Sequence, residues 1–262
     1  MLLFILTMLL TALTQVGGVV LLCSLALANL VSAVYPWQQN LLRLGIFLLL
    51  YTLTVRVITP MLAGKSGRVP LPCFASDNEP LQPANFGYCL LMRNYVKPEV
   101  RTHLLHIARQ FRQIHPGATL RYLDAGFPFL DGFPLLPHLS HSNGRKVDLA
   151  YFYQRKTGGR PVNFSPAWLG YWFYEQPSSP KENACLGRRN WLRWDFDWLQ
   201  PRYAAYALDV ERTRTLLTLL AADAQKILLE PHVQKKLGIQ AANIRFQGCH
   251  AARHDDHIHA QW

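Results

Sequence analysis

Five of the ten histidines lie in two short segments that also contain aspartates. The segments are His138-Leu-Ser-His141-Ser-Asn-Gly144-Arg-Lys-Val-Asp148 and His254-Asp-Asp-His257-Ile-His259. Imidazole nitrogen and carboxylate oxygen both suit zinc, and a catalytic zinc usually has three protein ligands and a fourth position for water. Two histidines and one aspartate from these segments would supply such a ligand set. The pattern therefore indicates a catalytic metal centre.

The first segment leads into a predicted strand. Residues 147–153, Val-Asp-Leu-Ala-Tyr-Phe-Tyr, are rich in β-branched and aromatic side chains, which favour strands. Asp148 then lies at the start of the strand and His141 on the turn before it, where Gly144 lets the chain bend back.

The second segment predicts a strand with both imidazoles on one face. Side chains alternate along a strand, so His257 and His259 point the same way and Ile258 the other. One histidine can bind metal while its neighbour faces the substrate. His138 and His254 each precede a histidine of their segment by three residues, close enough to support the ligands or handle protons.

These residues resemble a known family. His-x-x-Gly-x-x-x-Asp followed much later by His-x-His is similar to the LAS group of zinc peptidases, which includes lysostaphin-type and D-Ala-D-Ala peptidases. The longer patterns His-x-x-His-x-x-Gly-x-x-x-Asp and His-x-x-His-x-His narrow the resemblance to the penicillin-insensitive murein endopeptidases. It covers roughly residues 118–153 and 240–262.

The resemblance implies a function and a site. His141, Asp148 and His259 would bind Zn²⁺, His257 would be the catalytic histidine, and His254 and His138 would line the site. The implied reaction is hydrolysis of the peptide crosslinks of bacterial peptidoglycan by metal-activated water. The alternatives are a related zinc D,D- or L,D-carboxypeptidase acting on stem peptides, and an inactive anchored protein that binds the cell wall.

Some features depart from common zinc peptidases. The helical His-Glu-x-x-His motif is absent, and no glutamate adjoins either segment to act as a base. His257, and after it His254, is then the nearest candidate base. A structural zinc is the competing interpretation, but such sites usually have four ligands and are rich in cysteine, and Cys249 alone is near. We expect structural roles for the isolated histidines, which are His103, His106, His115 and His232.

Residues 1–63 are expected to anchor the chain in a membrane. Residues 1–42 contain no charged side chain, and the stretch from Leu44 to Ala63 contains only Arg56. A span needs about 20 apolar residues, so we predict a transmembrane hairpin with spans at Leu2 to Leu30 and Leu44 to Ala63. Positive charge in short loops favours the cytoplasm, so Arg43 in the connection places both ends outside, with the C-terminal domain in the periplasm of a bacterial inner membrane. A signal peptide cleaved near Ala26-Leu27-Ala28 is the alternative.

The remaining sequence predicts an α+β domain with an antiparallel sheet and flanking helices. Residues 64–96 are expected to be a linker and domain entry, and residues 97–262 the zinc peptidase domain. Apolar periodicity predicts helices over Lys97 to His115 and about Asp209 to Leu229. Strands are expected over residues 119–123, 243–246 and 257–261.

Four cysteines outside the first apolar stretch permit two disulfides in an oxidising compartment. Three connectivities are possible, and one of them joins Cys73 to Cys89 and Cys185 to Cys249. Four free thiols are the alternative. A region rich in aromatic residues, including Trp168, Trp172, Trp191, Trp194 and Trp198, lies between the two histidine segments. It is expected either to form part of the core or to form a wall of the substrate cleft.

The charge balance points to an anionic environment. Residues 64–262 carry 25 basic and 16 acidic residues, a formal charge of +9. Anionic lipid head groups and cell-wall polymers would both attract such a domain. We expect no nucleic-acid partner, because no recognised binding motif is present.

Overall fold

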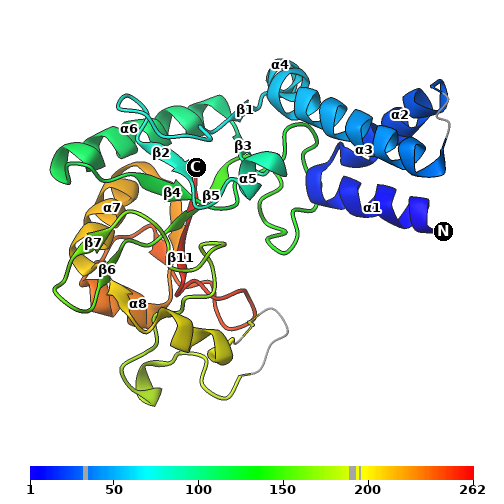
Figure 1. The fold of residues 1–262 in the computed structure, drawn as a ribbon. Helices are drawn as coiled ribbons and strands as arrows, with labels where there is room; N and C mark the ends of the chain where they lie inside the picture. Colours follow the sequence, from blue (N-terminus) through cyan, green and yellow to red (C-terminus); the bar gives the residue numbers. More distant parts are fainter. Residues whose placement is uncertain (32–34, 189–192, 195) are drawn as a thin grey trace.

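The computed structural model describes residues 1–31, 35–188, 193–194 and 196–262. In these residues, the N-terminal helices project from one side of an α+β domain (Figure 1). The projecting elements are α1 (Leu2–Thr14), α2 (Gly17–Asn29), α3 (Pro36–Leu53), a π-helical segment (Thr54–Ile58), α4 (Thr59–Ala63) and a 3-10 turn (Gly64–Ser66).

The first apolar stretch forms two helices rather than one. The chain turns at Gln15, whose φ of 69° lies in the left-handed region, and the Thr14 hydroxyl accepts a hydrogen bond from the Gly17 amide at 2.7 Å. Each helix has 13 residues, about 20 Å at 1.5 Å per residue, which is less than the roughly 30 Å of a bilayer core. The predicted single span from Leu2 to Leu30 was wrong, because the composition did not reveal this turn.

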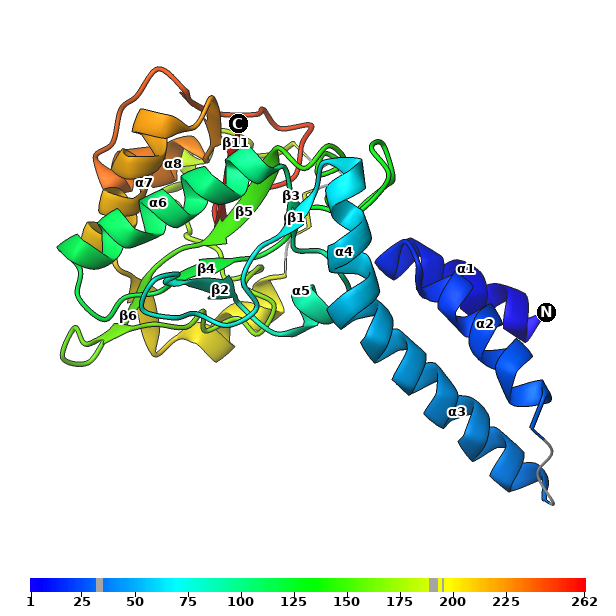
Figure 2. The same ribbon diagram turned by 90° about the horizontal axis from the view of Figure 1, so that it is seen from above.

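The second apolar stretch forms a long, continuous helical segment. It runs over Pro36–Ser66, begins earlier than the predicted Leu44, and is long and apolar enough to cross a membrane. Figure 2 shows it as a rod that leaves the domain beside α1 and α2. Most of its apolar side chains are exposed, including Leu44, Leu48 and Leu49. This is the surface expected of a helix whose surroundings are lipid.

A six-stranded sheet, counted over the described part of the chain, forms the centre of the domain. Its strand order is β10-β9-β11-β5-β4-β2. The strands are β2 (Leu81–Pro83), β4 (Leu120–Tyr122), β5 (Lys146–Ala150), β9 (Lys226–Leu228), β10 (Ile244–Arg245) and β11 (His257–Gln261). The β10–β9 and β2–β4 pairs are parallel and the other pairs are antiparallel. The predicted antiparallel sheet is therefore corrected to a mixed one. The connection between the strands of each outer pair contains a helix, α6 (Pro98–Ile114) or α8 (Pro231–Leu237), which lets the chain return in the same direction.

The central pair β11 and β5 separates a core face from a polar face. His259 lies opposite Asp148, and Ile258 lies opposite Leu149. Ile258 and Leu149 are fully buried in the main hydrophobic cluster. Strand alternation then sends His259 and Asp148 to the other face, as the sequence predicted.

Helices pack around the same core. The predicted helix over Lys97 to His115 is confirmed as α6 (Pro98–Ile114), which buries Leu104, Ile107 and Phe111. The predicted helix over Asp209 to Leu229 was wrong in its last six residues: α7 (Val210–Asp223) ends at Asp223, and β9 follows. Strand β9 pairs with both β10 and β11, and its Ile227 side chain lies in the core cluster. The short helix α8 (Pro231–Leu237) packs against α7.

Smaller elements complete the domain. A three-stranded sheet joins β7 (Pro161–Val162), β6 (Tyr153–Arg155) and β8 (Tyr206–Leu208), and a two-stranded one joins β1 (Val69–Pro70) to β3 (Tyr95–Val96). Short helical segments lie at α5 (Gly87–Leu90), Pro180–Glu182 and Asp197–Tyr203. The predicted strand over residues 147–153 is divided between β5 and β6.

Both candidate disulfides are formed. Cys73 is bonded to Cys89, and Cys185 is bonded to Cys249, while Cys23 is free. The second bond ties the aromatic-rich region to the segment that leads into β11.

Two residues, Gln15 and Arg68, join the N-terminal region to the loop before β5. The Gln15 side chain accepts a hydrogen bond from the Phe129 amide at 2.9 Å, at the turn between α1 and α2. Arg68, which follows α4, is buried and forms an ion pair with Asp131. The loop that bears His138 and His141 is thus held at two points close to the N-terminal helices.

Candidate metal centre

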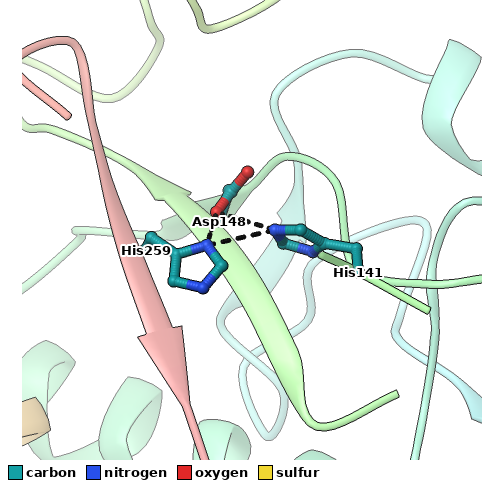
Figure 3. A group of neighbouring side chains, drawn as sticks. All are labelled: His141, Asp148 and His259. Carbon is teal, nitrogen blue, oxygen red and sulfur yellow. Dashed lines mark hydrogen bonds and ion pairs between the residues drawn. The ribbon is translucent and has the colours of Figure 1, made fainter. Parts of the chain in front are cut away.

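His141, Asp148 and His259 meet in a buried cluster (Figure 3). The His259 Nδ1 atom lies 2.8 Å from Asp148 Oδ1, and His141 Nε2 lies 3.1 Å from His259 Nδ1 and 3.2 Å from Asp148 Oδ1. All three residues are at most 4 % exposed. The structure therefore brings together the three predicted ligands from β5, β11 and the loop before β5.

The donor set suits a tetrahedral divalent ion. Zinc bonds of about 2.0–2.2 Å place neighbouring tetrahedral ligands about 3.4 Å apart, close to the distances between these three atoms. The His141 Nδ1 atom lies 3.0 Å from the Ala125 carbonyl oxygen, which fixes the tautomer that leaves Nε2 as a ligand. Tyr171 donates a hydrogen bond to Asp148 Oδ2 at 2.7 Å, so the second carboxylate oxygen is also oriented. These residues could hold a metal ion.

Electrostatics explain why a cation belongs here. Burial alone would raise the pKa of the Asp148 carboxyl, but the positive charges of His141 and His257 lower that pKa well below its usual range. Burial instead dominates at His259 and lowers its pKa to about 4. Asp148 is therefore an anion buried on all sides, and a buried anion requires a cationic partner. A divalent ion would supply that charge.

The catalytic candidate His257 lies beside the cluster on the same strand as His259. Its Nδ1 atom is 2.5 Å from Asp256 Oδ1, and its Nε2 atom is 3.7 Å from Asp148 Oδ2. Burial would lower the pKa of His257, but Asp148 and Asp256 raise it to about 9. Asp256 thus orients the ring so that Nε2 faces the cluster.

His138 is positioned by a second buried carboxylate. Its Nδ1 atom lies 2.7 Å from Asp124 Oδ2 and 3.8 Å from Asp148 Oδ2. Asp124 is in turn bound by Arg93 through two hydrogen bonds of 2.6 and 2.8 Å. Burial would raise the pKa of Asp124, but the hydrogen bond from His138 and the charge of Arg93 lower it. The Asp124–Arg93 pair therefore stays ionised and holds the His138 ring next to the cluster.

His254 completes the group of imidazoles. Its ring centroid lies 5.1 Å from that of His257 and 5.7 Å from that of His259. Burial, together with the charges of His257 and His259, lowers the pKa of His254 well below its usual value. The His254 imidazole is therefore neutral.

Three of the four isolated histidines named above contact neighbouring protein groups, as expected for structural roles. His103 pairs with Asp223, His115 lies 3.2 Å from the Thr215 hydroxyl, and His232 lies 2.6 Å from the Glu175 carbonyl oxygen. His106 is exposed on α6. Cys249 is in a disulfide and is therefore not available as a ligand, which weakens the structural-zinc interpretation.

Four residues of the site were not predicted from the sequence. They support the predicted histidines and aspartate through hydrogen bonds and are Arg93, Asp124, Tyr171 and Asp256. Asp256 lies inside the second histidine segment, directly before the catalytic candidate His257, but the sequence pattern gave it no role. Arg93, Asp124 and Tyr171 stand outside both segments, and their sequence surroundings carry no signal of the site.

Gly144 permits a close approach that no other residue allows. Its φ is 69°, and a Cβ atom there would lie 1.4 Å from Nη1 of Arg68. Arg68 is 1 % exposed and ion-paired with Asp131, so it has little room to move. The turn that carries His141 therefore depends on this glycine.

We expect Gly144→Ala to destabilise the domain and to reduce zinc content. Gly158→Ala is the matched control, because Gly158 has a φ of 78° but open space around it. The control should lose only about 1–2 kcal/mol from the left-handed backbone, and Gly144→Ala should lose clearly more in thermal unfolding. Equal losses would show that the Arg68 contact contributes nothing.

A cavity of about 600 Å³ adjoins the cluster. Its lining includes His138, Tyr171 and His257, which surround Asp148 of the cluster. Trp168, Trp172 and Trp194 form another part of its wall. The aromatic-rich region therefore contributes to a cleft, although Phe173 and Tyr171 of the same region are buried in the core. The region therefore supplies residues both to the core and to the wall of the cavity. Trp191 lies outside the described residues.

No protein-family model matches the sequence, and no curated protein is significantly similar to it.

Proposed function

We propose that the protein is a membrane-anchored zinc peptidase that cleaves peptide crosslinks of peptidoglycan. The observation that carries the proposal is the convergence of His141, Asp148 and His259 on one point, with His257 directed at the same carboxylate. The motif resemblance supports the LAS-type domain and the substrate. The long apolar helix Pro36–Ser66 supports the anchor, and a periplasmic location would bring the domain to its substrate.

Each part of the reaction has a candidate group. Zinc at the cluster would lower the pKa of water and polarise the scissile carbonyl. His257 can hold a proton at Nε2 and donate it toward negative charge that develops on the carbonyl oxygen. Asp256 keeps that ring oriented through Nδ1. His254 or His138 is placed to pass a proton to the leaving amine.

The membrane anchor in this proposal is not a simple hairpin of two transmembrane helices. The long helix begins at Pro36 and ends next to the domain, and the turn between α1 and α2 also contacts the domain through Gln15. α1 and α2 are each too short for a full perpendicular span. We assign the anchor to the Pro36–Ser66 helix, with α2 packed against it and α1 packed against α2.

The test is hydrolysis of cell-wall fragments by the full chain in detergent. We expect zinc-loaded protein to cleave crosslinked muropeptides, and chelation followed by dialysis to reduce the rate by at least about 100-fold, since the metal contributes several kcal/mol. Added zinc should restore the rate. Cleavage of monomeric stem peptides alone would indicate the carboxypeptidase instead, and a rate that chelation leaves unchanged would overturn the proposal.

A further inference from the structure

The domain contacts the long apolar helix well before the end of that helix. The Tyr51 hydroxyl donates a hydrogen bond to the Leu90 carbonyl oxygen at 2.7 Å, at the end of α5. Tyr51 precedes Ser66, the last residue of the helix, by 15 positions, which is about 20 Å at the helical rise. Between them, the Thr59 hydroxyl lies 3.5 Å from the Met92 sulfur. The domain therefore packs along a large part of the helix assigned above as the anchor.

A second contact lies at the same height along the helices. The Gln39 side chain donates a hydrogen bond to the Ala28 carbonyl oxygen at 2.9 Å, so these two residues mark one level of the long helix and α2. Val16 lies 12 residues from Ala28, and Tyr51 lies 12 residues from Gln39, so both are about 18 Å from that level. Val16, Tyr51 and Phe129 pack against the same small apolar cluster. The loop before β5 therefore meets the helices at the height where α5 meets them.

Little of the long helix remains below these contacts to cross a bilayer. Trp37 is 60 % exposed near the start of the helix, and tryptophan is enriched at membrane interfaces. Tyr51 follows Trp37 by 14 residues, about 21 Å, whereas the hydrocarbon core is about 30 Å thick. Arg56 follows Trp37 by 19 residues, about 28 Å, so we expect the near head groups at Arg56. The parts of the domain that contact Tyr51 lie below that level, and a tilt of the helix would increase their depth.

The domain surface at the two contacts has exposed apolar side chains. Leu90 is 45 % exposed and Leu130 is 60 % exposed. Arg56 is exposed at the expected level of the head groups, where a basic side chain is attracted to anionic lipid. The acidic neighbour of Leu130 is Asp131, whose charge is balanced by an ion pair with Arg68. Exposed leucines with a basic group beside them are typical of protein surfaces that lie in a membrane interface.

We propose that the catalytic domain itself lies in the membrane interface, with Leu90 of α5 and Leu130 of the loop before β5 inserted into the lipid. The inference rests on the membrane anchor of the proposed function, and it adds the bilayer as a partner of the domain. Gly87 of α5 and Leu136 of the same loop line the cavity beside the metal cluster. The site would therefore act on peptidoglycan close to the membrane surface.

The test places an environment-sensitive dye at single cysteines of the full chain, reconstituted in vesicles of phosphatidylcholine and phosphatidylglycerol. Cys23→Ser gives the background, because Cys23 is free and the other four cysteines form the two disulfides. Leu90→Cys and Leu130→Cys then each carry one dye. We expect both dyes to emit at shorter wavelength than in water, to lose emission when spin-labelled lipid is included, and to be protected from iodide in the solvent.

Two further positions calibrate the signal. Leu48→Cys labels an exposed leucine of the long helix and should be quenched by the spin-labelled lipid. Leu186→Cys is the matched control on the domain, because Leu186 is 63 % exposed and follows Glu182, which is ion-paired with Lys235 of α8. Both ribbon views place α8 away from the projecting helices (Figures 1 and 2). The dye at Leu186 should be quenched by iodide and not by the lipid.

The outcomes separate this inference from the proposed function. A dye at Leu90 or Leu130 that behaves like the dye at Leu186 would overturn the inference and leave the anchor and the peptidase intact. Protection from iodide without quenching by lipid would show that a second copy of the protein covers this surface, which also overturns the inference. A dye at Leu48 that lipid does not quench would overturn the anchor as well, whereas crosslink hydrolysis in detergent tests the peptidase independently.

Discussion

Alanine at His141, Asp148 or His259 is expected to remove both the metal and the activity. The three ligand atoms lie within 4.8 Å of one another, and a divalent ion that loses one of three protein ligands loses much of its affinity. We expect zinc content near zero after dialysis and a loss of at least about 1,000-fold in crosslink hydrolysis, which corresponds to about 4 kcal/mol. Metal analysis and hydrolysis should be measured on the same preparation.

A matched control is His106→Ala. It removes an imidazole from an exposed position on α6 and should leave zinc content and rate unchanged. The Asp148 variant needs a fold check, because its loss leaves several buried imidazoles without their anionic partner. Wild-type activity in any of the three variants at His141, Asp148 or His259 would contradict their assignment as ligands of a catalytic metal.

His257→Ala is expected to keep zinc and to lose turnover. His257 Nε2 points at Asp148 Oδ2 from 3.7 Å and is not one of the three ligand atoms. Removal of a positioned proton donor usually costs about 100- to 10,000-fold. The loss should appear mainly in kcat rather than in KM, because the ring acts on charge that develops during the reaction.

The Asp256→Asn variant tests separately how far the orientation of the His257 ring and its proton transfer contribute to the rate. It keeps the size of the side chain that bonds His257 Nδ1 but removes the charge that helps to raise the pKa of His257 to about 9. A smaller loss than in His257→Ala is expected, with the imidazole still present. If His257→Ala instead lost its zinc, His257 would be a ligand and the roles of the two histidines on β11 would have to be exchanged.

The sequence predicted the part of the site that depends on local periodicity. Alternation along one strand was enough to place His257 and His259 together and Ile258 in the core, and β11 has the predicted bounds. The helical pattern after Asp209 was misleading, because residues 226–228 form the strand β9 between β10 and β11, and Ile227 is buried in the core as part of that strand. Strands from distant parts of the chain leave no periodic signal in a single sequence.

The residues that hydrogen-bond to the site carboxylates could not be predicted for the same reason. Tyr171 and Arg93 reach the site only because the chain folds back from other regions, and each acts through one hydrogen-bonded carboxylate, Asp148 or Asp124. The turn at Gln15 that divides the first apolar stretch was hidden for a different reason. Composition measures how apolar a segment is but not where its backbone changes direction.

Anomalous diffraction at the zinc edge from crystals of the full chain is the most direct test of the metal centre. We expect one peak about 2.0–2.2 Å from His141 Nε2, His259 Nδ1 and Asp148 Oδ1, with a fourth position filled by solvent or a small ligand. A peak with four protein ligands, including His254 or His138, would make the metal structural, and the absence of a peak in zinc-loaded crystals would contradict the proposed metal centre altogether.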